Sequence, residues 1–334
     1  MKFLDFDFNN KTILVTGGAG FIGSNIALYI QKNYPFSRIV IFDCFRSGKK
    51  FENGNLISFG HYKNIIEFQG DIVCGNIAKL SDLEKLEAYK FDVIFHQAAI
   101  SDTRVYDQEI VMKTNVNSFY WFLEKTRKDN SVLIYASSAA TYGSCKPPQR
   151  IGIEDPENPY GYSKLMMDMI AKSFAINNPD LTIVGLRFFN VYGPNEFYKA
   201  KTSSMIIQLA HQLLEGKEPR LFENSENIFR DFVYIDDVVQ ANIRSVLSSK
   251  SGVYNVGSGI ARSFREVTDI LQFELGTSLP ITYITNPYTG YQNFTQADIS
   301  LSKEAINYSP MFSLEKGIKA YLPYIKKTFQ HDFY

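Results

Sequence analysis

The sequence predicts an α/β protein built on a doubly wound parallel sheet, with a smaller carboxyl-terminal α/β lobe. Short apolar runs rich in β-branched residues alternate with helical patterns from residue 12 to residue 190, and this alternation is typical of a parallel sheet covered by helices on both faces. The first of these runs leads directly into a glycine-rich turn. Because ligands of such sheets bind beyond the carboxyl ends of the strands, we expect the functional residues at that edge.

The first strand is expected at 12–16, and the glycine-rich turn at 17–23 precedes a helical pattern over 24–32. Glycines allow a tight turn, close approach of the backbone to a pyrophosphate, and close packing of the helix on the strand. The helix N-terminus adds unpaired N–H groups and a positive dipole. The turn therefore predicts Rossmann-type binding of a dinucleotide at Gly17, Gly20 and Gly23.

The second strand is expected at Arg38–Asp43, and its last residue bears on the choice of cofactor. An acid at about 20 residues after the glycine turn binds the adenosine ribose, so Asp43 favours NAD. However, Arg46, Lys49 and Lys50 follow in a loop, where they could pair with the 2′-phosphate of NADP. The residues alone leave NAD and NADP open.

Further strands of the sheet are expected at 92–99, 131–136, 182–194 and 252–257, the third of them running into a turn. Their carboxyl ends and that of the first strand share one edge of the sheet. The residues expected at this edge are Thr16, Ala99, Ser138 and Asn190.

The composition changes after residue 195, where the strand and helix alternation ends. We expect a dinucleotide-binding domain over 1–194, with a return segment at about 231–259, and a substrate-binding lobe formed by 195–230 and 260–334.

Tyr160 and Lys164 form a Tyr-x-x-x-Lys pair at the start of an amphipathic stretch. Residues four apart share one face of a helix, so both side chains can reach one substrate, and the ammonium favours ionisation of the phenol. Ser138, at the end of a strand, could hydrogen-bond the same alcohol. Together the three residues suit general acid/base chemistry at an alcohol.

Two other polar residues have open roles. His96 lies in the buried strand expected at 92–99, where a structural role is favoured over catalysis. Asn115 lies in a helical pattern for which asparagine has low propensity; it either bridges backbone and a catalytic water or is simply exposed.

The composition excludes several classes of function. With 35 basic and 35 acidic residues, the chain has no net positive field to hold nucleic acid or an anionic membrane. Its three cysteines, Cys44, Cys74 and Cys145, fit neither a disulfide framework nor a metal site. No stretch resembles a signal peptide or a membrane span. We therefore expect a cytoplasmic protein without a metal.

Taken together, the motifs resemble the extended short-chain dehydrogenase/reductase (NAD-dependent epimerase/dehydratase) family of nucleotide-sugar enzymes, over nearly the whole chain. The motifs are Gly17–Gly23, Ser137-Ser138, Tyr160 to Lys164, Arg187–Pro194 and Arg230–Asp237. Three shorter segments, 136–143, 221–227 and 294–298, point within this family to an epimerase of a nucleotide-diphosphate heptose.

The resemblance implies a role for each matching residue. The catalytic set is Tyr160, Lys164, Ser138 and a second acid/base at Lys199, with Lys201 as the alternative position. The cofactor contacts are Gly17, Gly20, Phe21, Ile22, Gly23, Asp43, Cys44, Lys50, Asn76, Ile77, Gln97, Ala98, Ala99, Asn115, Lys164 and Val191. The substrate contacts are Asn190, Lys201, Gln208, Phe222, Glu223, Asn224, Ser225, Arg230 and Tyr291.

The implied reaction is epimerisation at the exocyclic C6 alcohol of the heptose, which supplies lipopolysaccharide core synthesis. It would use one tightly bound NADP per subunit of a homo-oligomer, with NAD as the alternative cofactor. Epimerisation needs two proton donors because the carbonyl is reduced from either face. Tyr160 would serve one face and Lys199 the other.

Three other functions are weighed against this one. A hexose 4-epimerase shares Tyr160, Lys164 and Ser138, so only the second base and the substrate lobe distinguish it. A 4,6-dehydratase needs carboxylic acids beside the catalytic hydroxyl, where this chain has Ala139 and Ala140. A non-catalytic nucleotide sensor is disfavoured because the tyrosine and the lysine are both present.

Overall fold

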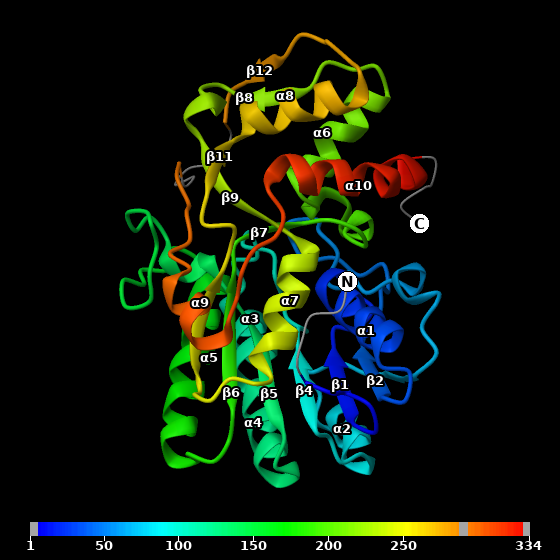
Figure 1. Ribbon diagram of the computed structural model, residues 1–334, viewed down its shortest axis with the longest axis vertical. Helices are drawn as coiled ribbons and strands as arrows, with labels where there is room; N and C mark the ends of the chain where they lie inside the picture. Colours follow the sequence, from blue (N-terminus) through cyan, green and yellow to red (C-terminus); the bar gives the residue numbers. More distant parts are fainter. Residues whose placement is uncertain (1–5, 287–292, 330–334) are drawn as a thin grey trace.

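The computed structural model describes residues 6–286 and 293–329. Among these residues, seven strands form one parallel sheet in the order β10-β6-β5-β4-β1-β2-β3 (Figure 1). The strands are β1 (Thr12–Thr16), β2 (Arg38–Asp43), β3 (Asp71–Cys74), β4 (Val93–His96), β5 (Val132–Ser138), β6 (Ile183–Phe188) and β10 (Gly252–Val256). The predicted fold class is confirmed, and 252–256 is a strand of the main sheet as expected.

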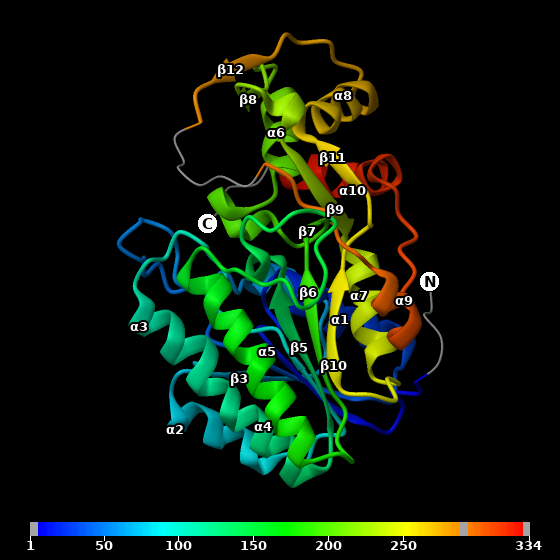
Figure 2. The same cartoon turned by 90° about the vertical axis from the view of Figure 1, so that its left-hand side faces the viewer.

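Helices cover both faces of this sheet, so its central strands β4 and β6 are buried along their whole length. In Figure 2 one face carries α2 (Leu80–Leu83), α3 (Gln108–Val111), α4 (Ser118–Asp129) and α5 (Pro159–Asn177). The other face carries α1 (Phe21–Asn33), α7 (Ile235–Ser245) and α9 (Ser300–Ile306). The β-branched and aromatic residues of the strands pack between these two layers.

Helix α1 begins at Phe21, three residues before the predicted start at Ser24. Gly20 is the N-cap in an extended conformation, so the helix starts inside the glycine motif. A Cβ on Gly23 would lie within van der Waals overlap of the Gly17 carbonyl. The glycine spacing thus lets the first helical turn sit directly on the end of β1.

The predicted strand at 182–194 is divided in two. β6 ends at Phe188, and Asn190–Tyr192 forms β7 in a separate sheet with β9 (Phe229–Tyr234) and β11 (Ala261–Ser263). The break falls at Phe189, whose N–H donates to the carbonyl of Val256 in β10 (3.0 Å). The chain therefore leaves the main sheet here and enters the carboxyl-terminal lobe.

The carboxyl-terminal lobe lies beyond the carboxyl ends of the main strands (Figures 1 and 2). It contains α6 (Met205–Leu214), α8 (Phe264–Leu275), α10 (Leu314–Phe329), β8 (Arg220–Phe222) and β12 (Thr282–Ile284). Helix α6 packs against α8 and α10. Helix α9, by contrast, packs against β10 and α7 of the main domain, a second return that the predicted domain boundaries do not include. Within 6–286 and 293–329, none of the helices has the length and apolarity to cross a bilayer.

Candidate active site

A cleft of about 790 Å³ lies at the carboxyl edge of the main sheet. Both predicted cofactor contacts and predicted catalytic residues line this cleft. The predicted residues that line it are Gly17, Gly20, Phe21, Ile22, Gly23, Asp43, Cys44, Asn76, Ile77, Gln97, Ala98, Ala99, Ser138, Tyr160, Lys164, Asn190, Val191, Lys199 and Arg230.

Other predicted residues are not brought to this cleft. Among the described residues, those outside its lining are Lys50, Asn115, Lys201, Gln208, Phe222, Glu223, Asn224 and Ser225. Tyr291 lies outside the described residues. Thr16, expected at the rim, is buried beneath it, where its hydroxyl accepts from the N–H of Ala98 (3.1 Å). A residue at a strand end faces the ligand only if its side chain points away from the core.

The cleft also contains residues that the sequence did not single out. Thr295 belongs to segment 294–298, which carries part of the family resemblance, but it has no predicted role. Ser58, Phe59 and Gly60 come from the long connection between β2 and β3. No motif marks these three residues, because they reach the cleft through tertiary contacts of an irregular segment. Lys113 and Thr114 also line the cleft. Their position next to Asn115 in the sequence was the one signal that could have predicted this.

The glycine turn has the shape that a pyrophosphate needs. Gly20 N–H donates to the Gly17 carbonyl (2.9 Å), which closes the turn. Gly17 has φ +64°, and a Cβ there would lie 2.9 Å from the backbone nitrogen of Ala98. Gly17 therefore packs against the segment after β4 only because it has no side chain, and the N-terminus of α1 opens into the cleft. The residues present fit a dinucleotide.

Asp43 is buried and is held by the backbone. Its carboxylate accepts from the N–H of Ala19 (3.0 Å) and from the N–H of Phe45 (2.8 Å). Burial raises the pKa of Asp43, and these hydrogen bonds oppose that rise. The carboxylate thus ties the glycine turn to the segment that follows β2, at the place where the adenosine ribose is expected.

The three basic residues of the loop after Asp43, namely Arg46, Lys49 and Lys50, are not among the described residues that line the cleft. Lys49 and Lys50 are exposed. Arg46 donates from its guanidinium to the backbone carbonyl of Tyr198. The 2′-phosphate contact that the sequence suggested is therefore not preformed in this structure.

The first predicted acid/base group, Ser138, Tyr160 and Lys164, is brought together by β5 and the first turn of α5. Asn158 caps this helix by accepting from the N–H of Gly161 (2.8 Å), and Pro159 occupies the first helical position. Tyr160 and Lys164 therefore lie one turn apart, with the Lys164 ammonium 6.0 Å from the centre of the Tyr160 ring. The helix delivers the spacing that the sequence predicted.

The electrostatics of this group are set by burial. Burial lowers the pKa of Lys164 to about 8, against the opposing effect of Asp168. Its ammonium donates to the carbonyl of Ala136 (2.7 Å). Burial raises the pKa of the Tyr160 phenol, and its hydrogen bond with Ser138 works in the other direction. A phenol so placed can give up and regain a proton between the serine and the lysine.

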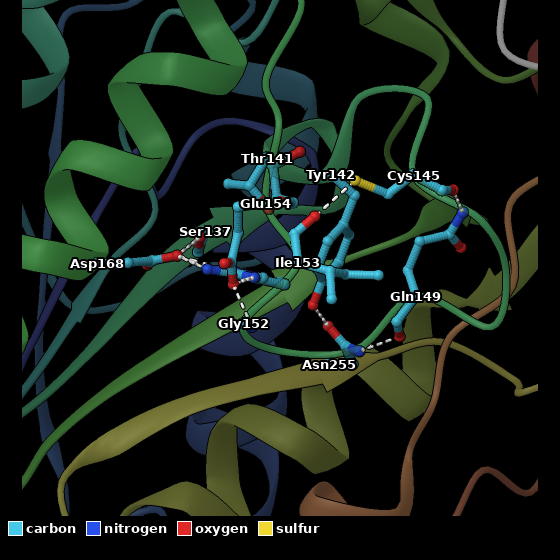
Figure 3. Close-up of polar contacts among 12 residues, drawn as sticks. Ser137, Thr141, Tyr142, Cys145, Gln149, Gly152, Ile153, Glu154, Asp168 and Asn255 are labelled. Carbon is cyan, nitrogen blue, oxygen red and sulfur yellow. Dashed lines mark hydrogen bonds and ion pairs between the residues drawn. The ribbon is translucent and has the colours of Figure 1, made fainter.

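A buried ion network lies next to this group, and Figure 3 shows the part of it around Ser137, Glu154 and Asp168. Asp168, one turn after Lys164 on α5, accepts from the Tyr135 hydroxyl, the Ser137 hydroxyl and the Arg187 guanidinium, each at 2.9 Å. Arg187 also donates to Glu154 (2.6 Å). The network joins β5, α5 and β6 just behind Ser138, and so fixes the strand end relative to the helix.

The other predicted acid/base, Lys199, comes from the irregular segment Phe197–Thr202. Its ammonium lies 5.6 Å from the centre of the Phe21 ring, at the start of α1. Burial lowers the pKa of Lys199, whereas Glu196 and Asp102 oppose this effect. Lys201 is exposed and is not among the described residues that line the cleft. The geometry thus favours Lys199 over Lys201.

Arg230 lies on β9 and is buried at the cleft. Its guanidinium donates to the Phe229 carbonyl (2.8 Å) and lies 5.8 Å from the centre of the Phe264 ring. Arginine held in this way keeps a planar fork for a phosphate.

Asn115 and His96 both have structural contacts. Asn115 is buried in a π-helical turn, Met112–Asn117, where its amide pairs with the backbone of Ile100 (2.8 and 3.0 Å) and donates to Ser163 (2.9 Å). The alternative that Asn115 is exposed is therefore wrong. His96 is buried against Thr16 (2.9 Å), and burial lowers its pKa to about 3. A structural role for His96 agrees with the expectation.

Comparisons with known proteins identify the family to which the chain belongs. The model of the NAD dependent epimerase/dehydratase family matches residues 13–257, a span that includes the glycine turn, the Tyr160 group and Arg230. The chain belongs to this family, so the predicted enzyme class, an epimerase with a nicotinamide dinucleotide as cofactor, is confirmed.

Three solved structures illustrate the similarity. ADP-L-glycero-D-manno-heptose-6-epimerase of Helicobacter pylori is 48% identical, with a TM-score of 0.89 over 98% of this chain and 99% of that one. UDP-glucose 4-epimerase of Thermotoga maritima, solved with UDP-glucose, is 28% identical, with a TM-score of 0.82 over 96% and 100%. UDP-glucuronic acid 4-epimerase of Bacillus cereus, solved with UDP-glucuronic acid and NAD, is 27% identical, with a TM-score of 0.80 over 95% and 99%.

Proposed function

We propose that this enzyme epimerises ADP-D-glycero-D-manno-heptose at C6 to give ADP-L-glycero-D-manno-heptose. The observation that carries the proposal is that one cleft is lined by two separate proton donors, Tyr160 and Lys199. The 48% identity to the Helicobacter pylori heptose epimerase over 98% of this chain supports the choice of substrate. The 4-epimerases are less similar, at 28% and 27% identity.

Tyr160 and Lys199 divide the proton chemistry. Tyr160 exchanges a proton with the C6 oxygen in one configuration of the alcohol, and Lys199 does so in the other. Ser138 hydrogen-bonds the same oxygen, and the Lys164 ammonium lowers the cost of ionising the Tyr160 phenol. The lowered pKa of Lys199 suits this task, because an acid/base group is most effective when its pKa lies close to the working pH.

The glycine turn, Asp43, Val191 and the backbone of Gln97 to Ala99 hold the dinucleotide. When bound, this cofactor accepts a hydride from the C6 carbon and returns it to the other face. We propose NADP, tightly bound at one per subunit, with NAD as the alternative. Support comes from the cations that follow Asp43, since flexible lysines such as Lys50 can turn toward a 2′-phosphate.

The substrate lies between the cleft and the carboxyl-terminal lobe. Arg230 binds its diphosphate, because a buried guanidinium fork suits phosphate oxygens. Asn190, near the strand ends, contacts the sugar. The remaining contacts follow from the family resemblance: Lys201, Gln208, Phe222, Glu223, Asn224, Ser225 and Tyr291. By the same resemblance, the enzyme is a cytoplasmic homo-oligomer that serves lipopolysaccharide core synthesis.

The test is incubation of the purified holoenzyme with ADP-D-glycero-D-manno-heptose and, separately, with UDP-glucose, followed by NMR of the product configuration. We expect inversion at C6 of the heptose and no 4-epimerisation of glucose. Turnover of UDP-glucose alone would identify a hexose 4-epimerase instead. The nucleotide released when the protein is denatured distinguishes NADP from NAD.

A further inference from the structure

Lys199 sits next to a strained residue. Ala200 has φ 51° and ψ −123°, a conformation that glycine adopts readily and that is unfavourable for other residues. The turn has local hydrogen bonds, from the Lys199 N–H to the Glu196 carbonyl (2.9 Å) and from the Thr202 hydroxyl to the Lys199 carbonyl (2.8 Å). Such strain persists only where surrounding contacts hold the backbone.

The base of this loop is held by the buried side chain of Glu196. Its carboxylate accepts from the N–H of Gly193 (3.1 Å) and from both the N–H and the hydroxyl of Ser204 (2.6 and 2.8 Å). Helix α1 adds a hydrogen bond from Asn25 to the Pro194 carbonyl (2.9 Å). These contacts close the loop at its ends. The tip, Tyr198 to Ala200, has local hydrogen bonds and also a contact from outside the loop.

The tip is held by His61, from the connection between β2 and β3. The rings of His61 and Tyr198 are stacked, with centres 3.8 Å apart and planes at 3°. Both side chains are buried, and the Arg46 guanidinium donates to the Tyr198 carbonyl. We call these three residues the Tyr198 clasp. An aromatic stack stabilises its two rings beyond the effect of their buried area, and so it can help to hold the strained backbone at Ala200.

The clasp connects the loop to the cofactor turn. The N–H of His61 donates to the carbonyl of Ala19 (2.9 Å), inside the glycine motif, and the side chain of Asn64 donates to the same carbonyl (3.1 Å). Burial, together with Arg46 and Lys63, lowers the pKa of His61 to about 4, so its ring is neutral near neutral pH. The contact between His61 and Tyr198 is therefore a stack of two neutral rings and not a cation–π interaction.

We propose that His61 is a positioning residue for Lys199: through its stack on Tyr198 it fixes the second acid/base relative to the turn that holds the cofactor. The proposal rests on the proposed function, since it assumes that Lys199 serves one half of an epimerisation. It gives His61, which no sequence motif marks, a role in positioning the second acid/base.

Two substitutions separate the ring from the other role of His61. His61 also caps a short 3₁₀ helix, because its side chain accepts from the N–H of Lys63. His61→Asn keeps a capping side chain but removes the ring, whereas His61→Phe keeps a planar ring but loses the cap. Ile66→Ala is the matched control in the same segment, since Ile66 is 74% exposed.

The experiment uses a 6-aldehyde analogue of the ADP-heptose, because this analogue can be both oxidised and reduced. Each half-reaction is isolated by combining the His61 substitution with a substitution of one acid/base residue. In a Tyr160→Phe background only the half served by Lys199 remains, and there we expect His61→Asn to lower the rate about 10- to 100-fold, as misplacement by about 1 Å does. In a Lys199→Met background the same change should leave the remaining half intact. His61→Phe and Ile66→Ala should behave like their parent in both backgrounds.

Three results would overturn the proposal: an equal loss of rate in both backgrounds, no loss of rate in either, or a loss of rate with His61→Phe as large as with His61→Asn. Amide hydrogen exchange of residues 197–203 supplies a readout that needs no substrate: we expect faster exchange in His61→Asn alone. If the wild-type protein did not act on the analogue, the proposed function would fail. The role of the Tyr198 clasp is tested separately by amide hydrogen exchange, and an unchanged exchange rate of residues 197–203 in His61→Asn would refute it.

Discussion

Tyr160 and Lys199 line the same cleft but lie on different kinds of backbone. Tyr160 sits in the capped first turn of α5, in register with Lys164 and beside the end of β5. Lys199 sits in a loop with a strained neighbour, held by contacts from α1, from Glu196 and from the segment after β2. The comparison teaches that helical spacing positions one acid/base group, whereas the other depends on residues distant in the chain.

The largest expected effect is on the helical side. Tyr160→Phe should lower the rate of epimerisation by a factor on the order of 10²–10⁴, because it removes only the phenolic proton donor. The cofactor should remain bound, since the ring is retained. Steady-state kinetics with ADP-heptose measure the effect, and Tyr162→Phe, at a residue that is 48% exposed, is the control. Normal turnover by Tyr160→Phe would remove this group from the mechanism.

Asp168→Ala tests what holds the helical side in place. The substitution leaves the buried Arg187 guanidinium and two hydroxyls without their shared acceptor, so we expect the free energy of unfolding to fall by about 3–5 kcal/mol. Chemical denaturation measures it, and Asp155→Asn, at an exposed carboxylate, should change stability by no more than about 0.5 kcal/mol. A loss below about 1 kcal/mol for Asp168→Ala would show that the network contributes little.

The pH dependence should differ between the two sides. Lys164 has a pKa of about 8 in the folded protein, below its ordinary 10.5, so its ammonium is lost as the pH rises through about 8. The half-reaction served by Tyr160, measured in Lys199→Met, should then fall about tenfold between about pH 7 and about pH 9. The effect on stability has the opposite sign, because burying an ammonium is unfavourable. The folded state is therefore stabilised by the deprotonation of Lys164 as the pH rises from about 8 to about 10.5.

A pH profile of Lys199→Met that stays flat through this range would separate Lys164 from the ionisation of Tyr160. The half-reaction that remains in Tyr160→Phe serves as the internal comparison, because it does not depend on the Tyr160 phenolate.

The smallest expected effect concerns the irregular segment that also supplies His61. If Lys50 turns toward a 2′-phosphate, Lys50→Ala should lower the preference for NADP over NAD by only about 2- to 5-fold, because Lys50 is exposed and such an ion pair is screened. Dissociation constants for the two dinucleotides measure the preference. An unchanged ratio would assign the selectivity to other residues.

The same contrast explains how much the sequence could predict. The sheet, the glycine turn and the Tyr160 group follow from local patterns: apolar runs, glycine spacing and a four-residue interval on a helix. Asn115 could not be placed in this way, because its burial depends on pairing with Ile100 across the chain. For the same reason, no local signal marked His61, Ser58 or the division of 182–194 at Phe189, all of which are decided by tertiary contacts.

The most direct test of this account uses the 6-aldehyde analogue with the single variants Tyr160→Phe and Lys199→Met. Each variant should lose net epimerisation, and the two should show opposite losses, each retaining the half-reaction served by the residue that remains. Lys201→Met should raise KM with little change in kcat, as expected for a binding contact. If instead Lys199→Met raised only KM while Lys201→Met lost kcat, or if both catalytic variants lost the same half-reaction, two separate proton donors could not be the basis of the mechanism.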